Sequence, residues 1–274
     1  MLEDRRIIFQ VLACKVVIKH EDPAISETFR YVVEHAEQAL RIRKVLTYDV
    51  RGSGPWKILE EGDHLDTFES MGEVLDVIYS RVYQRVFERL MLCEWIALHA
   101  ALVTINGRRT MLLGHKGAGK TTLTLRLMYA GHRVEGDEMV LVKGGRAIAL
   151  PRRFHLKPKT EQLVPEVRNL VPNMSSAGSG HEIVRAFDPL EAGFAWGITI
   201  SSVDRVIWIE PNHGGRTKLT RKGSFATLQN ILERSFSGSQ THRILVREVT
   251  KLAKSGGYEL ILGHPLDAVH ALAA

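Results

Sequence analysis

The sequence predicts an α/β fold with a core sheet and flanking helices, and three observations support this. The chain has 274 residues, 45% of them hydrophobic and 25% charged, as in a globular protein with ample material for a core. Strand-like and helix-like apolar patterns follow one another along it. Near its middle, an apolar strand at 111–113 runs through a glycine-rich loop into a helix, which is a common α/β unit.

Residues 1–70 are expected to form a small N-terminal α+β region, in which we find no residues that carry recognisable chemistry. A turn with the sequence Gly-Ser-Gly-Pro at 52–55 separates two strand patterns and predicts a hairpin. The expected elements are a strand at 7–18, a helix at 24–40, and two strands at 41–50 and 56–59.

Residues 71–96 are expected to form a helix that links this region to the rest of the chain. Ser70 and Glu73 form a capping box, and apolar residues then recur every three or four positions. So wide an apolar face indicates a helix buried between two layers. Tyr79 and Tyr83 on this helix are also compatible with an aromatic ligand box, although core packing is favoured.

Residues 97–274 are expected to form the main domain. Asn106 and Gly107 predict a hairpin whose second strand leads into the glycine-rich loop. The helix after the loop is expected to end at Gly131, which suits a left-handed cap. The remaining expected elements are a hairpin of strands at 139–142 and 146–150, a long loop at 165–180, a strand at 203–210, helices at 224–236 and 239–254, a strand at 258–262 and a closing helix from 266.

The glycine-rich loop fits the pattern G-x-x-x-x-G-K-[ST], in which backbone N–H groups surround phosphate oxygens. The following helix brings its positive end to the same place. Lys120 is expected to reach the β- and γ-phosphates of a nucleotide, and the Thr121 hydroxyl is expected to bind Mg²⁺. The residues expected to form this nucleotide site are Gly114, His115, Lys116, Gly117, Ala118, Gly119, Lys120, Thr121 and Thr122.

The residues on either side of the loop resemble a known family. His99 lies 21 positions before Lys120, since 120 − 99 = 21, and the pair Asp137-Glu138 begins 17 positions after it, since 137 − 120 = 17. This arrangement resembles the C-terminal kinase domain of HPr kinase/phosphorylase. In that family a histidine strand, a G-x-x-G-x-G-K-[ST] loop and an R-G-H-x-L-x-A-D-D segment come in this order.

The resemblance covers about residues 97–210 and implies a P-loop core of the HPr kinase/PEP carboxykinase-like type. By it, His99 matches the family histidine, Asp137 matches the first acid, and Glu138 replaces the second aspartate. The first ninety residues do not resemble the family's N-terminal domain. The resemblance therefore implies an HPr-kinase-like hydroxyl kinase without naming HPr as its substrate.

Phosphoryl transfer requires positioning, charge neutralisation and a group that takes the proton of the acceptor. We assign Asp137 as the general base and Glu138, with Thr121, to Mg²⁺, although the two acids could be exchanged. His99 would orient Asp137 and tune its charge if the two side chains touch. The basic run of Arg152, Arg153, Lys157 and Lys159 is equally compatible with a solvated surface and with a grip on phosphates.

The expected function is ATP-dependent transfer of the γ-phosphoryl group to a hydroxyl, most simply a serine of a protein or peptide. A P-loop ATPase that drives a partner is also compatible with the sequence, because the apolar strand 206–209 ends at Glu210, as a Walker B segment does. So are a nucleotide-binding switch module with little turnover and a small-molecule hydroxyl kinase. Whether the chain forms a homo-oligomer is left open.

The composition narrows the partners and the compartment. Lysine and arginine exceed aspartate and glutamate by 37 − 31 = 6, which suits anionic ligands, but no basic stripe interleaved with aromatic residues indicates nucleic-acid binding. Cys14 and Cys93 lack metal-site spacing and suggest a reducing cytoplasm. The apolar run before Cys14 has some features of a signal peptide, but Gln10 interrupts it and favours a strand. We expect no membrane-spanning segment.

Overall fold

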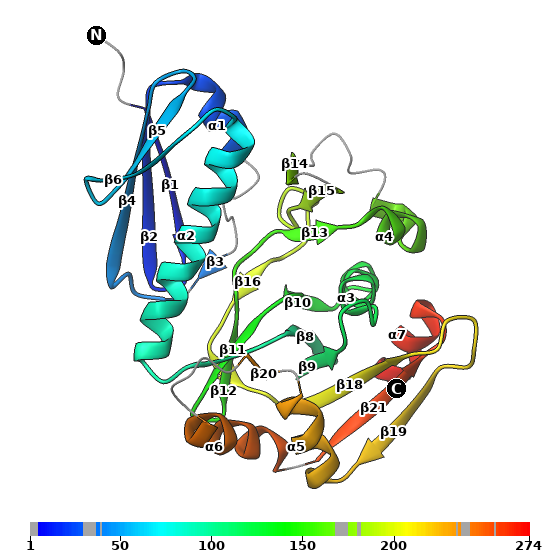
Figure 1. Cartoon of the computed structure of the whole chain (residues 1–274). Helices are drawn as coiled ribbons and strands as arrows, with labels where there is room; N and C mark the ends of the chain where they lie inside the picture. Colours follow the sequence, from blue (N-terminus) through cyan, green and yellow to red (C-terminus); the bar gives the residue numbers. More distant parts are fainter. Residues whose placement is uncertain are drawn as a thin grey trace.

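A computed structural model shows a mixed α/β protein built from several sheets and seven helices among the residues that it describes (Figure 1). The described residues are 5–29, 37–38, 40–167, 175–179, 182–233, 235–236, 242–254 and 256–274. The α/β prediction is therefore confirmed at this level. The division of the chain at residues 70 and 96 stays a prediction.

The first sheet contains five strands in the order β1-β2-β4-β5-β6. Their bounds are β1 Arg5–Val11, β2 Cys14–His20, β4 Lys44–Arg51, β5 Trp56–Glu60 and β6 Asp63–Phe68. The single strand expected at 7–18 is wrong, because the chain turns back at Leu12 with a φ of 53°. Two apolar residues with no glycine or asparagine form this turn, so no turn signal marks it. The hairpin of β4 and β5 is confirmed.

The helix expected at 24–40 is shorter than predicted. Helix α1 covers Pro23–Phe29, and β3 at Glu37–Gln38 pairs in parallel with β16 at Gly197–Ile198. Residues 30–36 lie outside the described residues. The prediction is therefore wrong at residues 37–38.

Helix α2, Met71–Leu92, runs along the first sheet, between that sheet and the rest of the molecule (Figure 1). Its capping box is confirmed, because the backbone N–H of Ser70 donates to Glu73 at 3.2 Å and the N–H of Glu73 donates to the Ser70 hydroxyl at 3.2 Å. Buried residues of α2, including Val82 and Val86, belong to a hydrophobic cluster that also contains residues of the first sheet and of strands after residue 95. The predicted burial between two layers is therefore confirmed.

The central sheet has the strand order β10-β8-β9-β18-β21-β19. Its strands are β8 Ala100–Ile105, β9 Arg108–Gly114, β10 Arg133–Gly136, β18 Arg205–Pro211, β19 Lys218–Lys222 and β21 Gly257–Leu262. Strand β18 is parallel to both β9 and β21. The carboxyl ends of these three strands therefore meet at one edge, where open α/β sheets bind ligands.

The two faces of the central sheet are covered differently. Helices α3, Lys120–Tyr129, and α7, Pro265–Ala273, pack on one face, where Ala101, Leu112 and Ile207 are buried with their side chains. The other face, with Leu102 and Met111, packs against a second sheet and helix α5. The second sheet has the order β17-β12-β11-β7-β20, so helices alone cover only one face.

The elements of this second layer are β7 Ile96–Leu98, β11 Val140–Lys143, β12 Arg146–Ala149, β17 Ser201–Ser202 and β20 Ser235–Phe236, with α5 Ser224–Leu232 and α6 His242–Ala253. Strand β20 replaces the end of the helix expected at 224–236. A three-stranded sheet of β13 Phe154–Leu156, β15 Glu182–Phe187 and β14 Ser175–Ser179 lies beside α4, Pro158–Leu163. The long loop expected at 165–180 is therefore wrong at 175–179, and residues 168–174 and 180 lie outside the described residues.

Among the described residues, no helix combines the length and the apolar character that crossing a membrane requires.

Candidate functional site: a glycine-rich loop facing an acid pair

The glycine-rich loop connects β9 to α3 at the carboxyl edge of the parallel strands. Gly117 and Gly119 have φ values of 85° and 95°, which favour glycine. At Gly114 the constraint is space, because a Cβ there would lie 2.9 Å from the backbone oxygen of Ile209 in β18. The glycines of the motif thus allow the loop to curl tightly over the end of β18.

Lys120 is the first residue of α3, and its side chain folds back over the loop. Its Nζ donates hydrogen bonds to the backbone oxygens of Gly114 at 2.9 Å and of His115 at 3.1 Å. Gly119, at the N-cap, supplies no side-chain cap to the helix. The first turn of a helix has N–H groups without intrahelical partners, so this end of α3 is suited to an anion.

His99 and the acid pair lie at two neighbouring crossings between the sheets. The chain leaves the second sheet at β7 and enters the central sheet at β8 through a bend at His99. It returns from β10 to β11 through a bend at Asp137 and Glu138. Because β8 pairs with β10 and β7 pairs with β11, the two bends are adjacent. The topology therefore brings residues that are 38 positions apart (137 − 99 = 38) to the same corner.

Asp137 contacts the first turn of α3, directly after the glycine-rich loop. It is 3% exposed, and the Thr121 hydroxyl donates a hydrogen bond to its carboxylate. Burial raises the pKa of Asp137 to about 6, while the positive charges of Arg152 and Lys120 act in the opposite direction. A carboxyl group with this pKa changes its protonation state close to neutral pH.

Glu138 faces a different set of partners. Its Oε1 lies 3.6 Å from Nδ1 of His99, and its Oε2 lies 3.3 Å from Nη2 of Arg152. Burial lowers the pKa of His99, and the charge of Lys120 lowers it further, while Glu138 raises it. His99 is thus held mainly neutral beside an acid that remains 40% exposed at its side chain.

The expected contacts of the two acids are therefore exchanged in the structure. Asp137, expected to be oriented by His99, accepts a hydrogen bond from Thr121. Glu138, expected beside Thr121, pairs with His99 and with Arg152. The structure does bring His99, Asp137 and Lys120 together, because the charge of Lys120 influences the pKa of each of the other two.

The position of Arg152 beside the acid pair was not predicted from the sequence. Arg152 follows β12, and its position is fixed because the N–H of Leu150 donates to the backbone oxygen of Met139 at 2.9 Å. Burial lowers the pKa of Arg152, but Tyr79, Asp137 and Glu138 raise it more. Its buried Nε has no hydrogen-bond partner among the described residues. The sequence left the basic run open between a solvated surface and a grip on phosphates, and the largely buried side chain of Arg152 beside Glu138 does not fit the solvated surface.

The other predicted residues have separate surroundings. His115 is exposed and packs against Trp208 in a T-shaped arrangement, with ring centroids 5.3 Å apart, and Lys116 is exposed. Arg153 is buried and pairs with Asp188 at 3.4 Å and Glu191 at 3.3 Å, so it belongs to the core rather than to a phosphate grip.

Oxygen atoms from Thr121 and Asp137 form the part of the site that suits a hard cation. Mg²⁺ is commonly bound by one or two carboxylates together with the phosphates of a substrate. Within the described residues, no group of three or more His, Cys, Asp or Glu side chains could hold a metal by itself. The donor set therefore fits a Mg²⁺ ion that arrives with a nucleotide.

Comparisons with known proteins add little to this geometry. No family model matches the sequence, and no curated protein matches it. Among solved structures, the HPr(Ser) kinase/phosphatase from Coxiella burnetii is similar at 13% identity and a TM-score of 0.29, over 64% of this chain and 96% of that chain. This similarity is too weak to assign the chain to a family.

Proposed function

We propose that the protein is an ATP-dependent kinase that transfers the γ-phosphoryl group to a hydroxyl. The observation that carries this proposal is the hydrogen bond from Thr121 of the glycine-rich loop to the buried Asp137, with Glu138 beside it. In such an arrangement the loop would bind the phosphates of the nucleotide. The acid pair would act on the opposite side of the γ-phosphoryl group, where the acceptor hydroxyl attacks.

The nucleotide would bind with its phosphates against the loop and the first turn of α3. Lys120 would exchange its bonds to the backbone oxygens of Gly114 and His115 for bonds to phosphate oxygens. Thr121 and Asp137 would hold Mg²⁺, which neutralises phosphate charge when bound. Arg152 supplies a second positive charge on the side of the acids.

We assign the role of general base to Glu138, and this exchanges the two acids relative to the assignment based on sequence. An acceptor hydroxyl must reach the base, and the Glu138 side chain is 40% exposed, whereas Asp137 is 3% exposed. His99 lies beside Glu138, with its Nδ1 3.6 Å from Oε1 and a hydrogen bond to the Glu138 backbone, and because its pKa is lowered it stays mainly neutral there. Asp137 then acts on the metal side of the phosphates.

The acceptor we propose is a serine of a protein or peptide. Support comes from the resemblance of residues 97–210 to the kinase domain of HPr kinase/phosphorylase. The acceptor could also be a hydroxyl of a small molecule, because the base removes the proton of a serine hydroxyl and of a small-molecule hydroxyl in the same way.

The test is transfer of label from [γ-³²P]ATP with Mg²⁺ to a library of serine-containing peptides, with free serine and glycerol in parallel. Wild type should label an acceptor, and Lys120→Ala should abolish labelling. Glu138→Gln should lower the rate by about 10² to 10⁴ with little change in nucleotide affinity. Nucleotide binding with neither label transfer nor ADP release would instead indicate a switch module.

A second candidate is a P-loop ATPase, and the sheet register supports it. In the parallel pair of β18 and β9, Ile209 lies opposite Gly114, so Glu210 follows at the end of the neighbouring strand, as in a Walker B segment. Glu210 is exposed and accepts a hydrogen bond from Trp208 Nε1 at 3.2 Å. If Glu210→Gln abolishes ADP release and Glu138→Gln does not, the ATPase replaces the kinase.

A further inference from the structure

A pocket of about 390 Å³ lies away from the glycine-rich loop. Its lining comes from the turn before β9 and from the amino ends of β18 and β21. These three parallel strands end at the edge that carries the loop. A strand of about six residues spans roughly 20 Å, so the pocket and the loop lie at opposite edges of one sheet.

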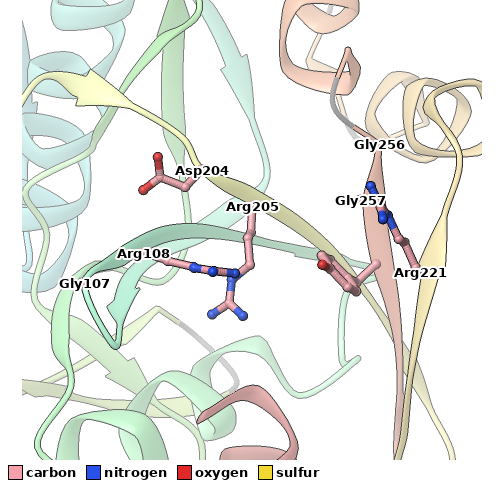
Figure 2. A pocket seen from close by; sticks show the side chains of 8 residues that line it. Gly107, Arg108, Asp204, Arg205, Arg221, Gly256 and Gly257 are labelled. Atoms are coloured by element: carbon pink, nitrogen blue, oxygen red, sulfur yellow. The ribbon is translucent and has the colours of Figure 1, made fainter. Parts of the chain in front are cut away.

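Three arginines line this pocket, namely Arg108, Arg205 and Arg221 (Figure 2). Arg108 and Arg205 lie close together, and Arg221 enters from the neighbouring strand β19. Among the described residues, neither Arg108 nor Arg221 forms an ion pair with an acid. These two side chains thus bring positive charge to the pocket that no ion pair within the described residues neutralises.

Asp204, the acid that lines the pocket, forms hydrogen bonds with the backbone of Arg109. Its Oδ2 accepts a hydrogen bond from the backbone N–H of Arg109 at 2.7 Å, and its own N–H donates to the backbone oxygen of Arg109 at 2.8 Å. Asp204 therefore closes the junction between β9 and β18. With three arginines and one aspartate, the lining has a net charge of 3 − 1 = +2.

Arg205 is held in place by the fold. Its Nε donates to the Thr110 hydroxyl at 3.2 Å, and its Nη1 and Nη2 both lie 3.5 Å from the backbone oxygen of Leu272. Burial lowers the pKa of Arg205 and the nearby charge of Arg108 lowers it further, while Tyr258 and Asp204 raise it. The fold therefore holds the charge of Arg205 near that of Arg108, and an anion between the two guanidinium groups would relieve their repulsion.

The wall of the pocket at Gly256 and Gly257 has no side chains, for structural reasons. A Cβ at Gly256 would lie 2.6 Å from the backbone oxygen of Lys222, and one at Gly257 would lie 2.7 Å from that of Val206. These glycines are required by the close packing of the strands. Their effect on the pocket is to leave room beside the arginines.

We propose that this pocket binds a small anion that carries at least two phosphate or carboxylate groups. Guanidinium groups bind both kinds of oxyanion in a bidentate manner. A volume of about 390 Å³ falls in the range of small-molecule sites, which is too small for a folded partner. The site is distinct from the glycine-rich loop and does not depend on the proposed kinase activity.

The test is isothermal titration of the full-length Lys120→Ala protein, whose loop site is disabled, with inorganic pyrophosphate and, separately, with citrate at low salt. One site should saturate. Arg108→Ala and Arg221→Ala, added singly, should each weaken binding by about tenfold or more. Arg43→Ala removes an exposed arginine of the first sheet region and should leave binding unchanged. The tighter of the two ligands identifies the oxyanion class.

A second measurement separates lost binding from lost folding. Pyrophosphate or citrate should raise the thermal unfolding midpoint of Lys120→Ala, and this rise should disappear in the Arg108→Ala and Arg221→Ala variants while their midpoints without ligand stay close to that of Lys120→Ala. Absence of saturable binding, or equal binding by all the arginine variants, would overturn the proposal. Tighter binding of a 12-nucleotide oligo(dT) through the same arginines would replace the small anion with nucleic acid.

Discussion

Two charge clusters lie only two residues apart along β10 and its following bend, yet they differ in how completely their polar groups are hydrogen-bonded. In the first, Arg109 and Glu135 form a bidentate pair with two N–H···O distances of 2.8 Å. The other N–H groups of Arg109 donate to the backbone oxygens of Ala147, Ser201 and Thr199, so all five guanidinium donors are used. Glu135 also accepts from the N–H of Thr199 at 3.2 Å.

The second cluster, at Asp137 and Glu138, is less complete. Asp137 is buried with a pKa of about 6, and the buried Nε of Arg152 has no hydrogen-bond partner within the described part of the chain. The first cluster ties β9, β10 and β12 to the segment at 199–201. In the second cluster the buried carboxylate of Asp137 and the unpaired Nε of Arg152 lower the stability of the folded protein, as charged groups at ligand-binding sites often do. The comparison therefore separates a cluster in which every guanidinium donor is paired from one that, in the residues described, keeps an unpaired buried donor.

The largest expected effect comes from breaking the complete cluster. Glu135→Gln leaves the buried charge of Arg109 without its counter-ion, and we expect the free energy of unfolding to fall by about 3–5 kcal/mol in urea titrations. The matched control is Glu88→Gln, which removes an exposed acid paired with Arg85 at 3.0 Å and should cost less than about 1 kcal/mol. Equal losses in the two variants would remove the distinction between the clusters.

An intermediate effect, opposite in sign, is expected from Asp137→Asn. The folded pKa of about 6 lies above the ordinary value of 3.8, so ionisation destabilises the folded protein. This cost is absent below pH 3.8, grows between the two pKa values and is complete above pH 6. The variant should therefore be more stable than wild type by up to about 3 kcal/mol at pH 8, and by little at pH 4.

The measurement is urea unfolding of wild type and Asp137→Asn at both pH values. Asparagine keeps an acceptor for the Thr121 hydroxyl, so the loop contact is retained. Label transfer should nevertheless be lost, which would show that the acid is kept for function and at the expense of stability. A variant that is destabilised equally at both pH values would contradict this.

The smallest effect on stability is expected from Glu138→Gln. Its side chain is 40% exposed, so the ion pair with Arg152 is screened by solvent, and the free energy of unfolding should change by less than about 1 kcal/mol. Phosphoryl transfer should still fall strongly. A large loss of stability would instead make Glu138 part of the structural corner.

The sequence predicted those parts of the fold whose signals are local. Asn106 and Gly107 form the hairpin turn with φ values of 49° and 75°, and Gly131 ends α3 with a φ of 86°. Strand β6 was missed because its residues are mostly exposed and polar, so no alternating apolar pattern marks it. The turn at Leu12 was missed because apolar residues form it.

For the candidate site, too, the sequence showed the local signals but not the contacts between distant residues. The loop motif is visible in the sequence, and the resemblance to HPr kinase/phosphorylase singled out His99 and Asp137, which lie at neighbouring bends in the structure. Their contacts were not predicted, because adjacent crossings between two sheets decide which acid faces Thr121 and which faces His99. Arg152 follows the hairpin of β11 and β12, which the sequence predicted, but the side chains that surround it at the corner come from distant parts of the chain, so no local pattern specifies its partners.

A ¹³C NMR titration of the Asp137 carboxyl group, with and without MgADP, shows whether the acid pair and the glycine-rich loop form one site. We expect a pKa of about 6 in the free protein and a clear fall when the nucleotide and its metal ion bind beside Thr121. An ordinary pKa near 3.8 that does not respond to MgADP would show that the acid pair and the glycine-rich loop do not form one site.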